Sequence, residues 1–130
     1  MSPALLLAQF SDNFSDGDFS TNPVWLGHTS FFKISTSTAI PSAMRPGLQL
    51  DNTVGDTSIL YVNNNMTLTD SLEWTCWVKL SFNPTSGNNA RYYLVSSQTD
   101  LNGSLNGYYI GIGETSDKLS LVRQDGTSKT

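Results

Sequence analysis

The most regular alternation of apolar and polar residues in this chain runs along Leu72-Glu73-Trp74-Thr75-Cys76-Trp77-Val78-Lys79-Leu80. Successive side chains of a β-strand point to opposite faces, so this pattern is typical of a strand that is buried on one side. Trp77 is the unusual member, because it is a large aromatic residue on the polar face. We expect Trp77 to face solvent and Cys76 to be a small buried hydrophobe rather than a nucleophile. The expected core-facing set is Leu72, Trp74, Cys76, Val78 and Leu80.

Similar short runs of β-branched and aromatic residues recur along the chain, separated by Asn, Asp, Gly, Pro and Ser. No segment shows a sustained apolar period of 3.6, which disfavours amphipathic helices. The pattern predicts an all-β fold, an antiparallel β-sandwich or jelly roll. The predicted strands span residues 24–25, 31–34, 48–50, 58–62, 72–82, 92–95, 107–112 and 119–123.

A second alternating stretch, Gly107-Tyr108-Tyr109-Ile110-Gly111-Ile112-Gly113, predicts a strand with glycine on one face. Its apolar members, Tyr108 among them, are expected to face inward. Tyr109 is then expected to face outward, where its flanking glycines leave the ring open or let a backbone or ligand approach. In Tyr92-Tyr93 one ring must face each way, so a single tyrosine of this pair joins the outward set.

Composition and charge disfavour or exclude several classes of function. The chain has 130 residues and a formal net charge of −4, from seven Lys and Arg against eleven Asp and Glu. That length fits one domain, and this balance disfavours nucleic acid as a partner. The single Cys excludes an internal disulfide and a four-cysteine zinc site, and the single His excludes a two-histidine metal motif.

The N-terminus carries a short apolar run, Pro3-Ala4-Leu5-Leu6-Leu7-Ala8, that is too brief to span a bilayer. It is similar to the end of a secretory signal peptide with a small residue at a cleavage point. The alternative is a first strand or a hydrophobic arm. We therefore treat residues 1–9 as a signal-peptide remnant or N-terminal arm, and residues 10–130 as one β-sandwich module.

Six blocks of sequence follow one another along the chain: Asn13–Phe19, Asn22–Trp25, Glu73–Leu80, Ala90–Ser96, Leu105–Tyr109 and Arg123–Gly126. In this order they resemble a module of secreted Bacteroidetes surface proteins that precedes lamin-tail or C-terminal sorting domains. These modules are laminin-G-like, concanavalin-like β-jelly rolls. The resemblance implies a secreted or cell-surface location and carries no catalytic motif. A complete jelly roll of this kind is longer, so the resemblance implies that the chain forms its N-terminal part, an incomplete sandwich with exposed edge strands.

Carbohydrate binding needs an exposed aromatic ring that stacks on a sugar, with amide or charged groups that bond its hydroxyls. The outward aromatic residues and their polar neighbours provide both, so a glycan or cell-surface polymer is an expected ligand. The alternative is that these rings pack beneath a loop or against another chain. The candidate ligand-binding residues are Trp77, Tyr109, Glu73, Lys79 and Tyr93.

Asp12, Asp16 and Asp18 cluster in one stretch near the N-terminus and could bind a structural calcium ion. Aspartates that bond their own backbone in turns explain the same spacing. No other cofactor is expected.

We expect a non-catalytic module for carbohydrate binding or adhesion. The first alternative is a structural module that associates with its own copies through sheet edges. A degenerate or truncated glycoside hydrolase is the weaker alternative, because no predicted strand carries the paired carboxylates that such enzymes use.

Overall fold

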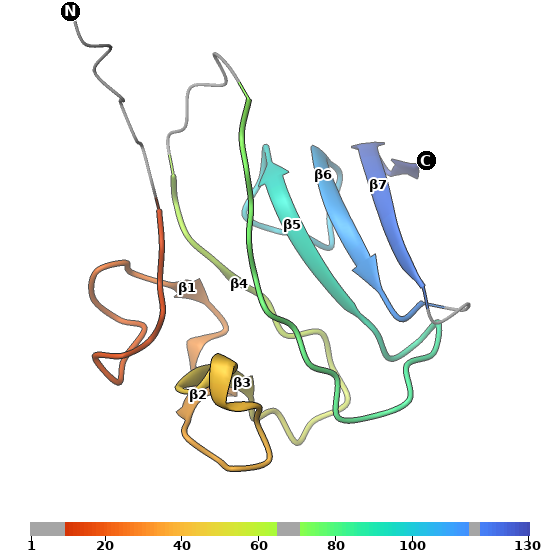
Figure 1. Cartoon of the computed structure of the whole chain (residues 1–130). Coiled ribbons are helices and arrows are strands. Elements are labelled where there is room, and N and C mark those ends of the chain that lie inside the picture. The colour runs from red at the N-terminus through yellow and green to blue at the C-terminus, as the bar shows by residue number, and fades with distance from the viewer. Residues whose placement is uncertain (1–9, 65–70, 115–117) are drawn as a thin grey trace, which may run out of the picture. The chain divides into compact units, whose positions relative to one another are not determined.

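A computed structural model describes residues 10–64, 71–114 and 118–130 of the chain. The chain divides into two compact units, Met1–Glu73 and Trp74–Thr130, and each is described here by itself (Figure 1). The expected signal-peptide remnant or arm at residues 1–9 lies outside the described residues. None of the helices in the described part of the chain is long and apolar enough to cross a lipid bilayer.

The first unit contains two small antiparallel sheets. Strand β1 (Leu26–Gly27) pairs with β4 (Leu60–Tyr61), and β2 (Phe32–Ser35) pairs with β3 (Gly47–Leu50). Two short 3₁₀ turns, η1 (Thr29–Phe31) and η2 (Ser42–Met44), lie between these strands in the sequence. Gly27 has a φ of +105°, and a Cβ there would lie 2.5 Å from the Ile59 carbonyl oxygen. Only glycine permits this close approach of β1 to the chain before β4.

The second unit is built on a four-stranded antiparallel sheet in which each strand pairs with the next (Figure 1). The strands are β5 (Ala90–Ser96), β6 (Leu105–Ile112), β7 (Leu119–Gly126) and β8 (Ser128–Lys129). The register between β5 and β6 shifts between Tyr93 and Val95, which is a β-bulge. Gly126, at φ +63°, ends β7 in the dipeptide Asp125-Gly126. The sheet is a meander of local hairpins.

The prediction of an all-β, antiparallel fold is confirmed by these sheets. Each unit, described by itself, contains small antiparallel sheets, and a sandwich or jelly roll is not shown by the described residues. The predicted strand at 72–82 is wrong, because no strand is present over residues 71–82. Trp74, expected in the core, is 36% exposed, and Cys76 is exposed as well. Alternation fixes which side chains share a face but supplies no hydrogen-bonding partner for the backbone, and a strand needs one.

The faces of β6 are opposite to those expected from its sequence. Tyr109 is buried, with 2% of its surface exposed, whereas Tyr108 is 45% exposed. Residues directly opposite in an antiparallel pair share a face, and Tyr109 lies opposite Tyr93 and Val122. The face that carries Tyr109 is therefore the interior side of β6. The prediction that Tyr109 points outward and Tyr108 inward is wrong.

Candidate functional site

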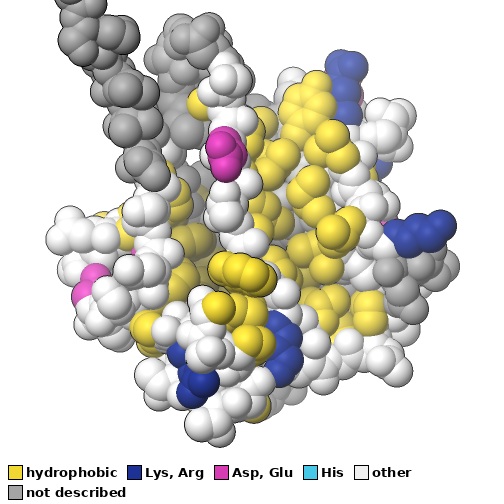
Figure 2. Space-filling model, in the orientation of Figure 1, with side chains coloured by type: hydrophobic (Ala, Val, Ile, Leu, Met, Phe, Trp, Pro, Cys, Tyr) yellow, Lys and Arg dark blue, Asp and Glu magenta, His cyan; other side chains and the backbone are white. Residues whose placement is uncertain are grey.

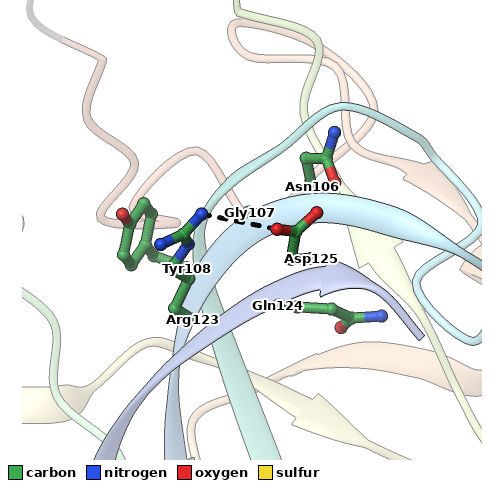
Figure 3. A pocket seen from close by; sticks show the side chains of 6 residues that line it. All are labelled: Asn106, Gly107, Tyr108, Arg123, Gln124 and Asp125. Atoms are coloured by element: carbon green, nitrogen blue, oxygen red, sulfur yellow. Dashed lines mark hydrogen bonds and ion pairs between the residues drawn. The ribbon is translucent and has the colours of Figure 1, made fainter. Parts of the chain in front are cut away.

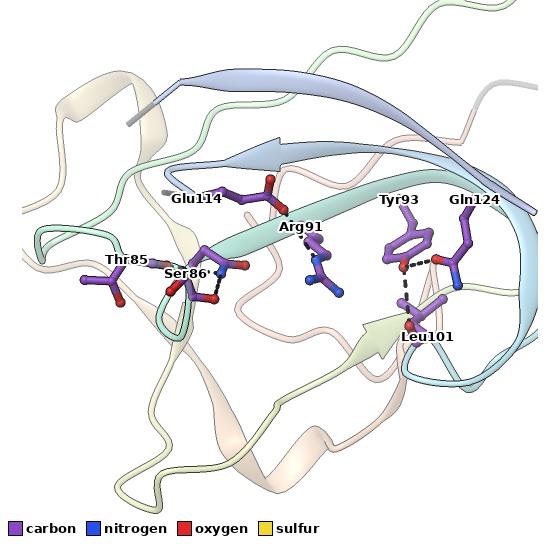
Figure 4. A network of polar contacts seen from close by, with 8 residues as sticks. Thr85, Ser86, Arg91, Tyr93, Leu101, Glu114 and Gln124 are labelled. Carbon is purple, nitrogen blue, oxygen red and sulfur yellow. Dashed lines mark hydrogen bonds and ion pairs between the residues drawn. The ribbon is translucent and has the colours of Figure 1, made fainter. Parts of the chain in front are cut away.

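The first group of interacting side chains surrounds Tyr109. Its ring lies 4.9 Å from the ring of Tyr93, centroid to centroid, with 36° between the planes. The Arg91 guanidinium carbon lies 5.3 Å from the Tyr109 centroid, in cation–π geometry. Arg91 also lies 3.9 Å from a carboxylate oxygen of Glu114 (Figure 4). These side chains form one stack across β5 and β6.

Gln124 joins this stack to the loop that links β5 and β6. The Tyr93 hydroxyl donates to Gln124 Oε1 at 3.0 Å and lies 3.3 Å from the Leu101 carbonyl oxygen (Figure 4). Gln124 Nε2 donates to the carbonyls of Gly103 and Gly126. Gln124 is 3% exposed, and each polar atom of its side chain has a partner. A satisfied buried network of this kind fixes a loop in one position.

Burial also changes the acidity of the stacked tyrosines. Desolvation raises the pKa of Tyr93 and of Tyr109, and the positive charge of Arg91 partly opposes this rise in both. A phenol that is harder to ionise stays neutral at every physiological pH. The structure brings together Tyr93 and Tyr109, two of the predicted ligand-binding residues, but it does so in a network in which Tyr109 is buried.

The remaining candidates for sugar binding lie in the exposed segment at residues 71–82. Trp77 is 72% exposed and Lys79 is exposed, both in the second unit, whereas Glu73 belongs to the first unit. Among the described residues, no ring contact joins Trp77 to Tyr93 or Tyr109. The neighbouring Cys76 thiol has a pKa raised by partial desolvation, which makes it a poor nucleophile at neutral pH. The exposed face expected around Trp77 and Tyr109 does not form.

The aspartates proposed for calcium lie in the first unit and bond to their own chain. Asp12 accepts from the Phe14 amide at 2.7 Å and from the Trp25 indole at 2.8 Å. Asp16 accepts from the Asp18 amide at 3.3 Å. Asp18 accepts from the amides of Ser20 and Thr21 and from their hydroxyls.

These bonds have an electrostatic consequence at Asp18. The Thr21 amide, followed by the Ser20 amide, lowers the pKa of the Asp18 carboxyl, because both stabilise its charged form. In the described part of the chain, no three Asp, Glu, His or Cys side chains gather as a metal site would require. The turn-forming alternative for these aspartates accounts for the contacts they make.

A shallow depression of about 280 Å³ lies where β6 and β7 pair near their Asn106 and Asp125 ends (Figure 3). Tyr108 lies opposite Arg123, and Asn106 lies opposite Asp125, so these four side chains share one face of the sheet. In Figure 3 the side chain of Gln124 points away from this group. The lining residues are Asn106, Gly107, Tyr108, Arg123, Gln124 and Asp125.

We call this hollow the Tyr108 depression. Its polar groups are accessible to solvent. Arg123 and Asp125 are 60% and 70% exposed, and their 3.4 Å ion pair is of the weak, solvent-screened kind. Asn106 Oδ1 accepts from the Gly126 amide at 3.2 Å, which leaves the two Nδ2 protons for a ligand. An aromatic ring, a guanidinium, a carboxylate and an amide therefore lie together around one hollow.

Sequence reasoning missed this site. The sequence predicts Tyr108 in the core and Arg123 at the end of a strand, and it gives neither Arg123 nor Asp125 a binding role. These residues come together through the pairing register of β6 with β7, and the sequence of either strand alone does not give that register. The depression has one carboxylate among its lining residues, so it lacks the carboxylate pair of a glycoside hydrolase.

No known family model, curated protein or solved structure matches this chain.

Proposed function

We propose that this chain is a non-catalytic binding module that holds a carbohydrate in the Tyr108 depression, as part of a secreted or cell-surface protein. One observation supports this proposal above all others. A half-exposed aromatic ring lies on the same sheet face as three polar side chains, and all four line one hollow. This is the combination that sugar recognition needs.

Each group has a role in such binding. The Tyr108 ring offers a flat apolar surface to the C–H face of a pyranose. The Asp125 carboxylate accepts hydrogen bonds from hydroxyls, while Arg123 and Asn106 donate them. Because the Arg123–Asp125 pair is exposed, a ligand that replaces it loses little interaction energy.

The size of the hollow limits the ligand. Its volume of about 280 Å³ lies just below the range of roughly 300–1,000 Å³ of small-molecule sites. One sugar ring fits, so the module would recognise a chain end or a single residue within a longer glycan. A shallow site of this size predicts weak binding, in which affinity for a polymer comes from many low-affinity contacts.

A glycan array followed by NMR titration of the best glycan tests the proposal. We expect millimolar binding, with amide shifts at residues 106–108 and 123–125. Tyr108→Ala should weaken binding at least tenfold, because it removes the stacking surface. Trp77→Ala is the matched control, since it deletes an exposed aromatic residue of the same unit outside the depression. It should leave the affinity unchanged.

Two results would contradict carbohydrate binding at this site. One is glycan binding that survives Tyr108→Ala but is lost in Trp77→Ala. That result would place the sugar contact at Trp77, as the sequence first led us to expect. The other is the absence of any glycan that shifts the amides of β6 and β7 at millimolar concentration.

A further inference from the structure

Hydrophobic side chains are open at the surface of this molecule (Figure 2), and several of them belong to one continuous stretch of chain. Residues 71–79 are all exposed, and Leu80 is partly exposed. Contiguous apolar surface of this kind marks a contact site on a soluble protein. The large exposed hydrophobic residues of this stretch are Leu72, Trp74, Trp77, Val78 and Phe82.

This stretch has the sequence of a β-strand without being one. Residues 72–80 alternate between apolar and polar side chains, yet no strand is present there. Figure 1 shows them, in green, as an extended run. An extended segment becomes a strand when a second strand pairs with its backbone, and strand addition of this kind is a recurring mode of recognition. The partner to expect is therefore another strand.

Residues 72–80 are complementary to a second copy of themselves in the antiparallel orientation. When two copies pair about Cys76, Glu73 of each copy lies opposite Lys79 of the other. Both cross-strand pairs then join opposite charges, which stabilises an antiparallel pair. Directly opposite residues share a face, so the apolar side chains of the two copies meet on one side of the ribbon.

The charges distinguish this arrangement from others. Within one extended copy, six positions separate Glu73 from Lys79 by about 20 Å, so the strand cannot form this pair with itself. A parallel, in-register pairing places Glu73 beside Glu73 and Lys79 beside Lys79, which is repulsive. A shift of the antiparallel register in either direction removes both opposite-charge pairs. The charges therefore favour a second copy, paired about Cys76.

We propose that residues 72–80 pair with the same residues of a second copy of this chain, as an antiparallel two-stranded ribbon whose twofold axis passes through Cys76. Such a contact is self-complementary and closes after two copies. The proposal does not depend on the carbohydrate proposal, because the segment shares no residue with the Tyr108 depression.

The position of Cys76 gives this register a chemical reporter. Directly opposite residues of an antiparallel pair have Cα atoms about 4.5 or 5.5 Å apart, within the roughly 4.4–6.8 Å that a disulfide spans. Cys76 is exposed, and it is the single cysteine of the chain. A disulfide-linked dimer therefore reports contact at this position alone.

The contact is small. Each copy contributes one strand about 30 Å long, which covers less than the roughly 800 Å² per partner of a standard interface. We therefore expect a transient dimer with a dissociation constant of about 0.1–1 mM.

Sedimentation velocity of the full chain from about 10 μM to 2 mM, under reducing conditions, tests the proposal. Glu73→Lys should raise the dissociation constant at least tenfold, because it places Lys opposite Lys in both pairs. The double variant Glu73→Lys with Lys79→Glu restores opposite charges, and its dissociation constant should return to within about threefold of the parent value. Asp56→Lys is the control, because it makes the same charge change at an exposed position of the first unit.

Oxidised glutathione at pH 8.5 then tests the register, since two Cys76 thiols exchange with it to give one disulfide and two reduced glutathiones. The parent and the double variant should form the linked dimer at least tenfold faster than Glu73→Lys. A monomer at every concentration would overturn the proposal. So would a double variant as weak as Glu73→Lys, or equal linking rates in all the variants, because the contact would then lie elsewhere. None of these changes touches the Tyr108 depression, so such a failure leaves the carbohydrate proposal standing.

Discussion

Replacement of Tyr109 by alanine should lower the free energy of unfolding of the β5–β8 sheet by about 3–5 kcal/mol, the range for large aromatic side chains removed from a core. Tyr109 is 2% exposed and stacks on Tyr93 beneath the Arg91 guanidinium. Its removal leaves a cavity and deletes both contacts. Urea unfolding followed through the NMR amide signals of β6 measures the loss within this unit.

Tyr108→Ala is the matched control, because it makes the same change at the next position of the same strand. Tyr108 is 45% exposed, so its loss should be about 1 kcal/mol and well below that of Tyr109→Ala. Equal losses in the two variants, or a larger loss in Tyr108→Ala, would show that the two faces of β6 are assigned incorrectly.

Gly107→Ala should destabilise the same sheet by about 3 kcal/mol or more. A Cβ at position 107 would overlap the carbonyl oxygen of Val95 and lie 3.2 Å from Ser96 Cα, both of them backbone atoms of β5. Backbone held in a ladder cannot move aside as a flexible side chain can, so β5 and β6 must separate locally. This penalty outweighs the 0.5–1 kcal/mol or so that alanine gains over glycine in a strand.

Gly87→Ala is the control for this substitution. A Cβ at position 87 would have no atom within 4 Å, and the residue does not occupy the left-handed region. Its free energy of unfolding should change by no more than about 0.5 kcal/mol. Thermal unfolding of both variants, monitored in parallel, compares them. A Gly107→Ala chain as stable as the parent would contradict the close packing of β5 on β6.

The strands were largely predictable from local sequence, because β-branched and aromatic runs between turn residues are a local signal. The runs at 92–95, 107–112 and 119–123 each fall within β5, β6 and β7. The turn at Asp125-Gly126 was also predictable, since glycine accepts the positive φ that ends β7. These signals predict the conformation of a segment, but they do not say with which other segment it pairs.

The orientation of β6 was not predictable from the alternation alone. A period of two assigns residues to two faces but does not say which face is interior. The more apolar set, with Tyr108, was expected inside. The glycine-bearing set is the interior one instead, because Gly107 lets the backbone of β5 approach and Tyr93 stacks on Tyr109. The expected approach of a backbone to a glycine does occur, but it occurs on the buried face.

The Tyr108 depression depends on contacts between distant positions, and this explains why it was missed. Tyr108 and Arg123 lie opposite one another because of the register between β6 and β7, and no motif in either strand predicts that register. The prediction of a strand at 72–82 was wrong for a related reason. Its alternation is the clearest in the chain, yet no strand forms there, and Trp77 is exposed and does not line the Tyr108 depression.

Photochemically induced nuclear polarisation of the native chain, read by NMR, reports directly which tyrosine rings solvent can reach. We predict a strong signal from the ring of Tyr108 and none from the ring of Tyr109. A polarised Tyr109 with a silent Tyr108 would reverse the faces of β6, and the site assigned to Tyr108 would be lost with them.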